Sequence, residues 1–401
     1  MAAISAAALK SAAAIRERCG NIAAAVTAGN SRHFHIDRTR IPAAAERVAD
    51  VTRRRYPDLA IPYHSRWRHF EAGGRDRRAE LDRPLPAADR ARMEIDLTVV
   101  SVLLDAGAGP AWGYVEAETG QRYTRSEGLG VASFRAFAQG AFSATPGEPW
   151  RVDAAALAAI DAGKLGALFQ VSDANPLVGL EGRAALLRRL GRALVEQQET
   201  FGTMARPGAL FDRLTYGSQR NAVNATAILR ELLDGLGSIW LTGSTFDGVA
   251  LGDVWQHPHA GGVGPTAGWV PFHKLSQWLA YSLFEPYERA GFEVTRRDEL
   301  TGLPEYRNGG LLLDTGVLAL RNDADALVAW DVGSALVVEW RALTVALLDE
   351  LAPQVRQRLG APALPLACIL EGGTWAAGRE LAMALRGGDP PLAITSDGTV
   401  F

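Results

Sequence analysis

The sequence predicts a mainly α-helical protein with minor β structure, an α+β fold. Helical periodicity recurs along most of the 401 residues. It is clearest at 334–358, where four leucines fall on one side of the expected helix: Leu336, Leu343, Leu347 and Leu351. Stretches of strand character are short and broken by glycine and aspartate. The chain has no internal repeat and no low-complexity linker, so we expect helices packed around one large core or a few smaller ones.

Helix-favouring patterns follow one another along the chain. The first is rich in alanine, the residue with the highest helix propensity. Asp153 suits the cap of a helix that starts at Ala154, and Pro271 suits a first helical position. We expect helices over these stretches: 1–30, 42–56, 85–105, 125–143, 151–169, 178–203, 221–237, from 271–273 onward, 334–358 and 375–386.

Strands and turns are expected at few places. Residues 238–256 favour a short hairpin or loop, a glycine turn precedes the helix at 375, and 392–401 favours a final strand with an Asp-Gly turn. We divide the chain into three regions of one compact unit. They are an N-terminal helical region at 1–95, a helical core with the candidate active site at 96–330, and a C-terminal helix and strand region at 331–401.

Composition excludes several classes of protein. The net charge of -3 argues against a protein whose main partner is nucleic acid or an anionic membrane. Cys19 and Cys368 are too few for a disulfide framework, and no run approaches the roughly 18 apolar residues that span a bilayer. We therefore expect a cytoplasmic protein with neither nucleic acid nor membrane as a partner. The sequence does not fix its oligomeric state.

Lys274 is the first candidate for chemistry. The chain has 42 basic residues, and almost all of them are arginines. The only lysines are Lys10, Lys164 and Lys274, so a lysine is an unusual choice in this chain. The helix expected after the glycine-rich loop 261–270 places Lys274 in its first turn, where free backbone N–H groups favour an anion. Gln277 shares its face. The same spacing fits a solvated lysine on an ordinary amphipathic helix.

The stretch LTGLPEYRNGG at 300–310 is the second candidate. Pro304 and the Gly309-Gly310 pair predict a loop. Its four central positions carry a carboxylate, a phenol, a guanidinium and an amide, on the residues Glu305, Tyr306, Arg307 and Asn308. Loops carry binding and catalytic groups more often than regular elements do. A solvated surface turn fits the same residues.

These motifs carry a resemblance to a known family. PFHKLSQWLAYSL, LTGLPEYRNGGLLLDTGVL, VSVLLDAGAG, RSEGL, VEWRALTVALLD, LEGGTWAAGRE and SDGTVF together resemble the uracil catabolism protein 4 family over nearly the whole chain. A more distant likeness is to the queuosine salvage proteins, which hydrolyse the N-glycosidic bond of queuosine 5'-phosphate. They show a helix with Lys and Gln three apart and then an acidic-Tyr-Arg element. Their acidic residue is Asp, whereas this chain has Glu305.

The resemblance implies both a fold and an activity. It implies a helical core similar to that of DNA glycosylases, with additions, and an N-glycosidase that acts on a ribosylurea 5-phosphate or a related nucleotide-like 5'-phosphate without a cofactor. Glu305 would be the main catalytic carboxylate, with Lys274 holding phosphate or the leaving group. Eight side chains would contact the substrate: Gln277, Tyr306, Arg307, Asn308, His273, Trp278, Trp67 and Arg68.

Further candidates lie outside this stretch. Asp105 opens a glycine-rich loop and is a second catalytic carboxylate candidate. In HSRWRHF, at 64–70, Trp67 could stack on a planar group while Arg68 holds a charge. Most of the other arginine clusters fit solvated faces or salt bridges, and Arg341 is expected to pair with Glu339 beside a core Trp340.

Histidine spacing leaves one metal site open as an alternative. It would combine four side chains: Asp253, His257, His259 and His273. With it the chain would be a metal-dependent amidohydrolase that cuts a ureide bond. The family resemblance instead implies that these histidines line a pocket without metal. A non-catalytic binding protein of the uracil pathway is the other alternative.

Overall fold

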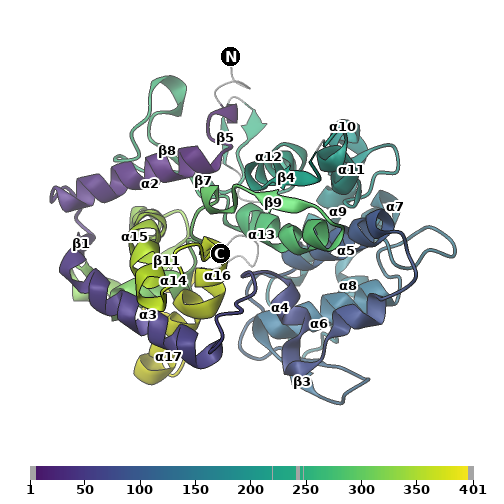
Figure 1. The fold of residues 1–401 in the computed structure, drawn as a ribbon, viewed down its shortest axis with the longest axis horizontal. Coiled ribbons are helices and arrows are strands. Elements are labelled where there is room, and N and C mark those ends of the chain that lie inside the picture. Colours follow the sequence, from purple (N-terminus) through teal and green to yellow (C-terminus); the bar gives the residue numbers. More distant parts are fainter. Residues whose placement is uncertain (1–5, 219, 241–243, 247, 396–401) are drawn as a thin grey trace. The chain divides into compact units, whose positions relative to one another are not determined.

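The computed structural model describes residues 6–218, 220–240, 244–246 and 248–395. Helices dominate, and the strands among these residues pair only as two-stranded sheets (Figure 1). The predicted class, mainly α with minor β, is confirmed. Within the described part of the chain no helix is both long enough and apolar enough to cross a membrane.

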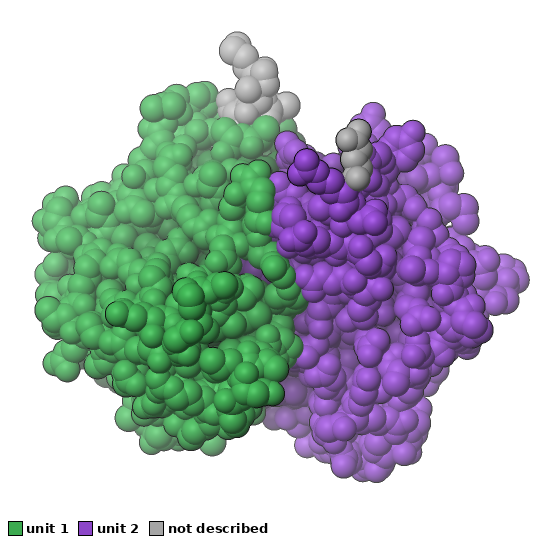
Figure 2. All heavy atoms as spheres, in the orientation of Figure 1, with its two compact units in different colours: residues 1–64, 244–277, 296–396 green, residues 65–243, 278–295, 397–401 purple. Residues whose placement is uncertain are grey.

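The chain divides into two compact units, coloured separately in Figure 2. The described residues of unit 1 come from 1–64, 244–277 and 296–396, and those of unit 2 come from 65–243 and 278–295. Each unit therefore draws on more than one of the regions expected at 1–95, 96–330 and 331–401. Helix α13 (Lys274–Arg289) begins in unit 1 and continues in unit 2.

Unit 1 is built around the 25-residue helix α15 (Ala335–Leu359), which packs against α2 (Ala12–Thr27) and α3 (Ile41–Arg55) (Figure 1). Its four predicted leucines are all buried. Helix α14 (Tyr306–Asp314) packs on α17 (Trp375–Arg386), which follows α16 (Leu366–Ile369) and the π-helical turn η8 (Leu370–Thr374).

The strands of unit 1 form four small sheets. Three are antiparallel: β1 (Phe34–Ile36) with β10 (Leu318–Leu320), β5 (Thr245–Phe246) with β6 (Val249–Ala250), and β7 (Val254–Gln256) with β8 (Trp269–Pro271). One is parallel, β11 (Ala329–Asp331) with β12 (Ala393–Thr395). The β5–β6 pair confirms the hairpin expected within 238–256. Residues 241–243 and 247 of that stretch, and the Asp-Gly turn expected at 397–398, lie outside the residues that the structure describes.

Unit 2 is centred on α5 (Ala87–Leu103), which is buried from Met93 to its end. It packs against α6 (Arg125–Ala138), α9 (Leu180–Glu196) and α11 (Ala209–Thr215). Its other helices are α4 (Trp67–Phe70), α7 (Ala154–Ala158), α8 (Ala162–Leu168), α10 (Gln198–Phe201) and α12 (Ala225–Gly235). Its sheets pair β2 (Tyr114–Val115) with β3 (Arg122–Tyr123), and β4 (Ala222–Asn224) in parallel with β9 (Glu293–Thr295). Asp153 caps α7, as predicted.

Several local predictions were wrong. Residues 222–224, expected to open a helix, form strand β4, and the helix expected over 151–169 is divided into α7 and α8. Pro271 ends strand β8 instead of opening a helix, and α13 starts at Lys274. The residues after Glu305 form helix α14 instead of a loop. The glycine turn expected before 375 is the π-helical turn η8, which runs directly into α17.

Gly378 shows how closely helices α14 and α17 approach. A Cβ at this helical position would overlap the carbonyl oxygen of Arg307. We expect Gly378→Ala to lower the free energy of unfolding by about 1–3 kcal/mol, because close-packed interiors tolerate added atoms poorly. Gly20→Ala in α2 is the matched control, since nothing lies within 4 Å of its added methyl group. There we expect a gain of up to about 1 kcal/mol from helix propensity. Urea denaturation of both variants measures the difference, and equal effects would contradict it.

Candidate functional site

Glu305 is the N-cap of helix α14. Its backbone is extended, and its carboxylate turns back over the first turn of the helix. One oxygen accepts the backbone N–H of Arg307 at 2.8 Å, and the other accepts that of Asn308 at 2.6 Å. Shorter side chains are the usual N-caps, because Ser, Thr, Asp and Asn reach these N–H groups directly. The helix therefore holds the Glu305 carboxylate at its positive end.

The electrostatic surroundings of Glu305 bring two predicted residues together and add one that sequence reasoning missed. Desolvation by burial raises the pKa of Glu305 above its ordinary value. The two backbone hydrogen bonds, and then electrostatic interactions with His64 and Lys274, oppose this rise in pKa. Lys274 and Glu305 thus lie within electrostatic reach of each other inside unit 1. His64 belongs to the same group.

Asp253 fixes the start of helix α13, where Lys274 stands. Its Oδ2 accepts the backbone N–H of Lys274 at 3.0 Å, and its carbonyl oxygen accepts the backbone N–H of Phe272. Arg341 holds the carboxylate through two hydrogen bonds of 2.8 and 2.7 Å, and Trp255 donates a third. Burial alone would raise the pKa of Asp253, but the charge and hydrogen bonds of Arg341 hold it at about 2. Asp253 is therefore ionised at neutral pH.

His273 completes this clamp. Its φ of 48° lies in the left-handed region that a non-glycine residue seldom adopts, so the backbone is strained just before Lys274. The ring contacts the carbonyl oxygen of Leu9 through Nε2 at 3.0 Å, and burial lowers its pKa. His273 is 3% exposed. Its main contact is thus with protein backbone.

Gln277 ties helix α13 to the segment before Glu305. Its Oε1 accepts the backbone N–H of Thr301 at 3.0 Å, and its Nε2 donates to the hydroxyl of Thr301 at 2.7 Å. The side chain is fully buried. Of the two residues in the Lys-x-x-Gln motif, Lys274 therefore belongs to the group around Glu305, whereas Gln277 holds the segment that leads to Glu305.

Arg307 and Asn308 are held in the first turn of α14, beside the more exposed Tyr306. The Arg307 guanidinium lies 4.7 Å from the centre of the Tyr306 ring and donates to the carbonyl oxygen of Gly388. Asn308 donates to the carbonyl oxygen of Leu303, and its side-chain oxygen accepts no hydrogen bond from any described residue. A buried amide oxygen of this kind can accept a hydrogen bond from a ligand.

Asp105, Trp67, Arg68 and Trp278 belong to unit 2. Burial raises the pKa of Asp105, and the Arg66 guanidinium, at 2.6 Å, opposes that rise. The indole of Trp67 donates to the carbonyl oxygen of Ser282 at 2.9 Å, and Trp67 and Trp278 are 2% and 6% exposed. Arg68 pairs with Glu285 at 2.7 Å. These contacts are packing, hydrogen bonds and ion pairs inside unit 2.

The alternative metal ligands do not form a shared centre. Among the described residues, no three His, Cys, Asp or Glu side chains are grouped so that they could hold a metal ion. Asp253 is taken by Arg341, and His257 lies 3.4 Å from Glu339. His259 contacts the carbonyl oxygen of Asn30 instead. Arg341, which was expected to pair with Glu339, forms an ion pair with Asp253.

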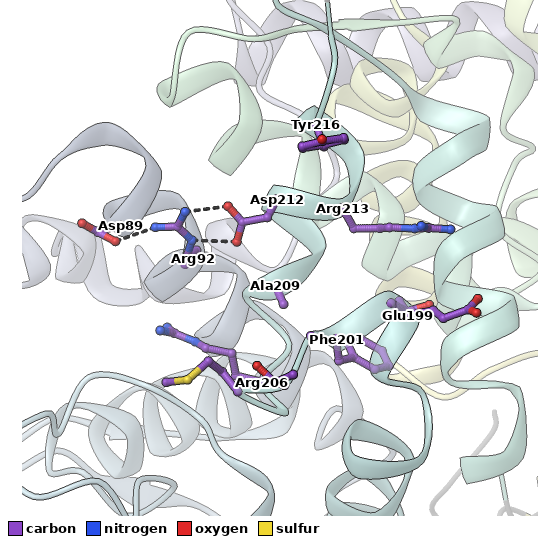
Figure 3. Close-up of a pocket in the computed structure, with 13 residues that line it drawn as sticks. Asp89, Arg92, Glu199, Phe201, Arg206, Ala209, Asp212, Arg213 and Tyr216 are labelled. Atoms are coloured by element: carbon purple, nitrogen blue, oxygen red, sulfur yellow. Dashed lines mark hydrogen bonds and ion pairs between the residues drawn. The ribbon is translucent and has the colours of Figure 1, made fainter.

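A surface hollow of about 550 Å³ in unit 2 is a second candidate binding site (Figure 3). Three arginines line it, and each is paired with carboxylates: Arg92 with Asp89 and Asp212, Arg206 with Asp96, and Arg213 with Glu231. Its arginines are thus paired within the protein, and no predicted catalytic residue lines it. The group around Glu305 is the stronger candidate.

The chain is similar to one protein family and to two known proteins over nearly its whole length. A family model described as "Protein of unknown function (DUF1688)" matches residues 8–401. The "Protein urg3" of Schizosaccharomyces pombe is 40% identical over 384 residues, which cover 92% of each chain. The "Uracil catabolism protein 4" of Lachancea kluyveri is 38% identical over 409 residues, covering 93% of each chain. The resemblance to the uracil catabolism protein 4 family is confirmed. The resemblance to the queuosine salvage proteins stays a prediction. The chain belongs to the family described as DUF1688.

Proposed function

We propose that the chain is a hydrolase of an N-ribosyl bond in uracil catabolism. The substrate would be a ribosylurea 5-phosphate or a related nucleotide-like 5'-phosphate. The name of the Lachancea kluyveri relative supports the pathway. The observation that carries the chemistry is the Glu305 carboxylate, held by two backbone N–H groups and within electrostatic reach of Lys274 and His64.

The role of Glu305 follows from the reaction. Breaking an N-ribosyl bond builds positive charge on C1' and on the ring oxygen of the sugar. An ionised Glu305 stabilises that charge and takes a proton from the attacking water, so that hydroxide bonds to C1' as the nitrogen departs. Hydrolysis of this kind exchanges no electrons with a cofactor, and we propose none.

Lys274 supplies the cation in this proposal. It stands in the first turn of α13, where backbone N–H groups add to the attraction for an anion. Lys274 would bind the 5'-phosphate or donate a hydrogen bond to the leaving urea. Tyr306, Arg307 and Asn308 would position the sugar or the leaving group, with the Asn308 side-chain oxygen accepting from a substrate N–H or O–H.

The raised pKa of Glu305 predicts how the reaction rate falls at low pH. The base must be ionised, so kcat/KM should fall as the pH drops through a pKa above the ordinary value of 4.5. A pH profile of kcat/KM measures this fall. Glu305→Gln should remove it from any residual activity, and a midpoint below 4.5 would contradict the assignment.

Substrate turnover tests the function itself. Purified protein is incubated with uridine 5'-phosphate and, separately, with its enzymatically ring-opened product, and products are followed by mass spectrometry. We expect urea and ribose 5-phosphate from the ring-opened compound. Release of ammonia with the ribosyl bond intact would identify an amidohydrolase instead. Binding of the compounds without turnover would identify a binding protein.

A further inference from the structure

His64 is oriented by a buried carboxylate of unit 1. Its backbone N–H donates to the carbonyl oxygen of Ala367, and its ring nitrogen Nδ1 lies 2.8 Å from Oε2 of Glu371. The two side chains are 12% and 9% exposed. A carboxylate on one ring nitrogen fixes the orientation of an imidazole and stabilises its protonated form.

Glu371 is itself held in place. It lies in the π-helical turn η8, and turns of this kind often occur at functional sites. Its second carboxylate oxygen lies 3.3 Å from both Arg55 and the hydroxyl of Tyr56. Arg55 also donates to the carbonyl oxygen of Glu371 at 2.7 Å. Four groups from three segments therefore form a chain that ends at the His64 ring.

This chain and Glu305 meet at the same ends of two packed helices. The His64 ring centre is 6.1 Å from that of Trp375, the first residue of α17. One turn later, Gly378 touches the backbone of Arg307 in the first turn of α14, which Glu305 caps. His64 also lies within electrostatic reach of the Glu305 carboxylate.

We propose that His64 is the general acid that protonates the departing nitrogen, with Glu371 as its positioning residue, while Glu305 acts on the water from its cap position. The proposal rests on the proposed N-ribosyl hydrolase function and adds the second half of its acid–base pair. Nitrogen leaving groups such as ureas are poor anions and depart as neutral molecules, which requires a proton donor.

The step is balanced with water as the only co-reactant. The C1'–N bond breaks and its electron pair goes to nitrogen, which takes the proton from Nε2 of the His64 imidazolium. A water oxygen bonds to C1' and gives its proton to Glu305. Transfer of that proton from Glu305 through solvent to His64 restores both groups for the next cycle.

A purely structural His64–Glu371 pair predicts a different response to the leaving group. The test compares ribosylurea 5-phosphate with 4-nitrophenyl ribofuranoside 5-phosphate, whose nitrophenolate departs without protonation. His64→Asn places its amide nitrogen near Nδ1 and so keeps a donor for Glu371, but it lacks the proton on Nε2. His35→Gln, an exposed histidine of the same unit, is the matched control.

We expect His64→Asn to lower kcat for ribosylurea 5-phosphate by at least about 100-fold, the usual contribution of a general acid, and by less than about fivefold for the nitrophenyl compound. His35→Gln should leave both rates unchanged. Glu371→Gln should lower kcat for the ribosylurea by about tenfold with KM unchanged, because it acts only through His64.

Equal losses of His64→Asn on the two compounds, or no loss on either, would overturn the role of His64 while leaving the hydrolase function intact. Inactivity of the unaltered protein on both compounds would instead remove the proposed function, and the role of His64 with it. Urea denaturation of each variant separates misfolding from chemistry. If His64→Asn does not fold, His64→Gln on the same two compounds decides the question by the same criterion.

Discussion

Glu305→Gln is expected to lower kcat for ribosylurea 5-phosphate by at least about 100-fold, because the variant cannot take a proton from water or balance the charge on C1'. The amide retains one oxygen that can accept a backbone N–H, so α14 should lose no more than a cap contribution of about 0.5–2 kcal/mol. Steady-state kinetics and urea denaturation of the same preparation measure the two effects separately.

Asp153→Asn is the matched control for this variant. Asp153 is also a buried carboxylate that caps a helix, but it caps α7 in unit 2 and is not in the proposed site. We expect a similar loss of stability with little loss of kcat. A fall of less than about tenfold in kcat/KM for Glu305→Gln would assign Glu305 to helix capping alone.

Asp253→Ala is expected to lower the free energy of unfolding by about 3–5 kcal/mol, the usual cost of leaving one partner of a buried ion pair behind. Arg341, which is 1% exposed, would lose both of its hydrogen bonds to the carboxylate. The backbone N–H of Lys274 would also lose its acceptor at the start of α13. Urea denaturation measures the change.

The Arg38–Glu350 pair provides the control, because it is also held by two hydrogen bonds but its side chains are 40% and 36% exposed. Glu350→Ala should cost no more than about 1 kcal/mol. The pKa of Asp253 is lowered from 3.8 to about 2 in the folded chain, so its stabilisation is complete above 3.8 and is lost as the pH falls towards 2. A similar cost for both variants at pH 7 would contradict the difference in burial.

The fold was predictable wherever one element carries its own signal. Helices α3, α15 and α17 lie within one or two residues of their predicted ranges, because periodic apolar positions reflect burial directly. Helix α14 was missed because a Gly309-Gly310 pair usually marks a turn. Gly309 instead gives Trp340 room to pack, since an added Cβ would lie 2.7 Å from its indole ring.

The candidate site was predictable only in part, for the same physical reason. Lys274 and Glu305 stood out through local composition and spacing. The partners of other groups are distant in sequence: Glu371 lies 307 positions from His64, and Arg341 lies 88 positions from Asp253. Such pairs are created by helix packing, and local pattern does not encode them. Gln277 was expected to contact substrate, yet the structure uses its amide to tie two segments together.

The arrangement of unit 1 bears on how the chain reaches this state. Helices α2 and α3 end before residue 56, whereas α15, against which both pack, begins at 335. During translation, the apolar faces of these two helices stay uncovered until α15 has been synthesised, which happens only after most of the chain has been made. Such non-local contacts slow folding and expose aggregation-prone surface in the meantime. Chaperone binding to the nascent chain is therefore expected to matter most between synthesis of α3 and release of α15.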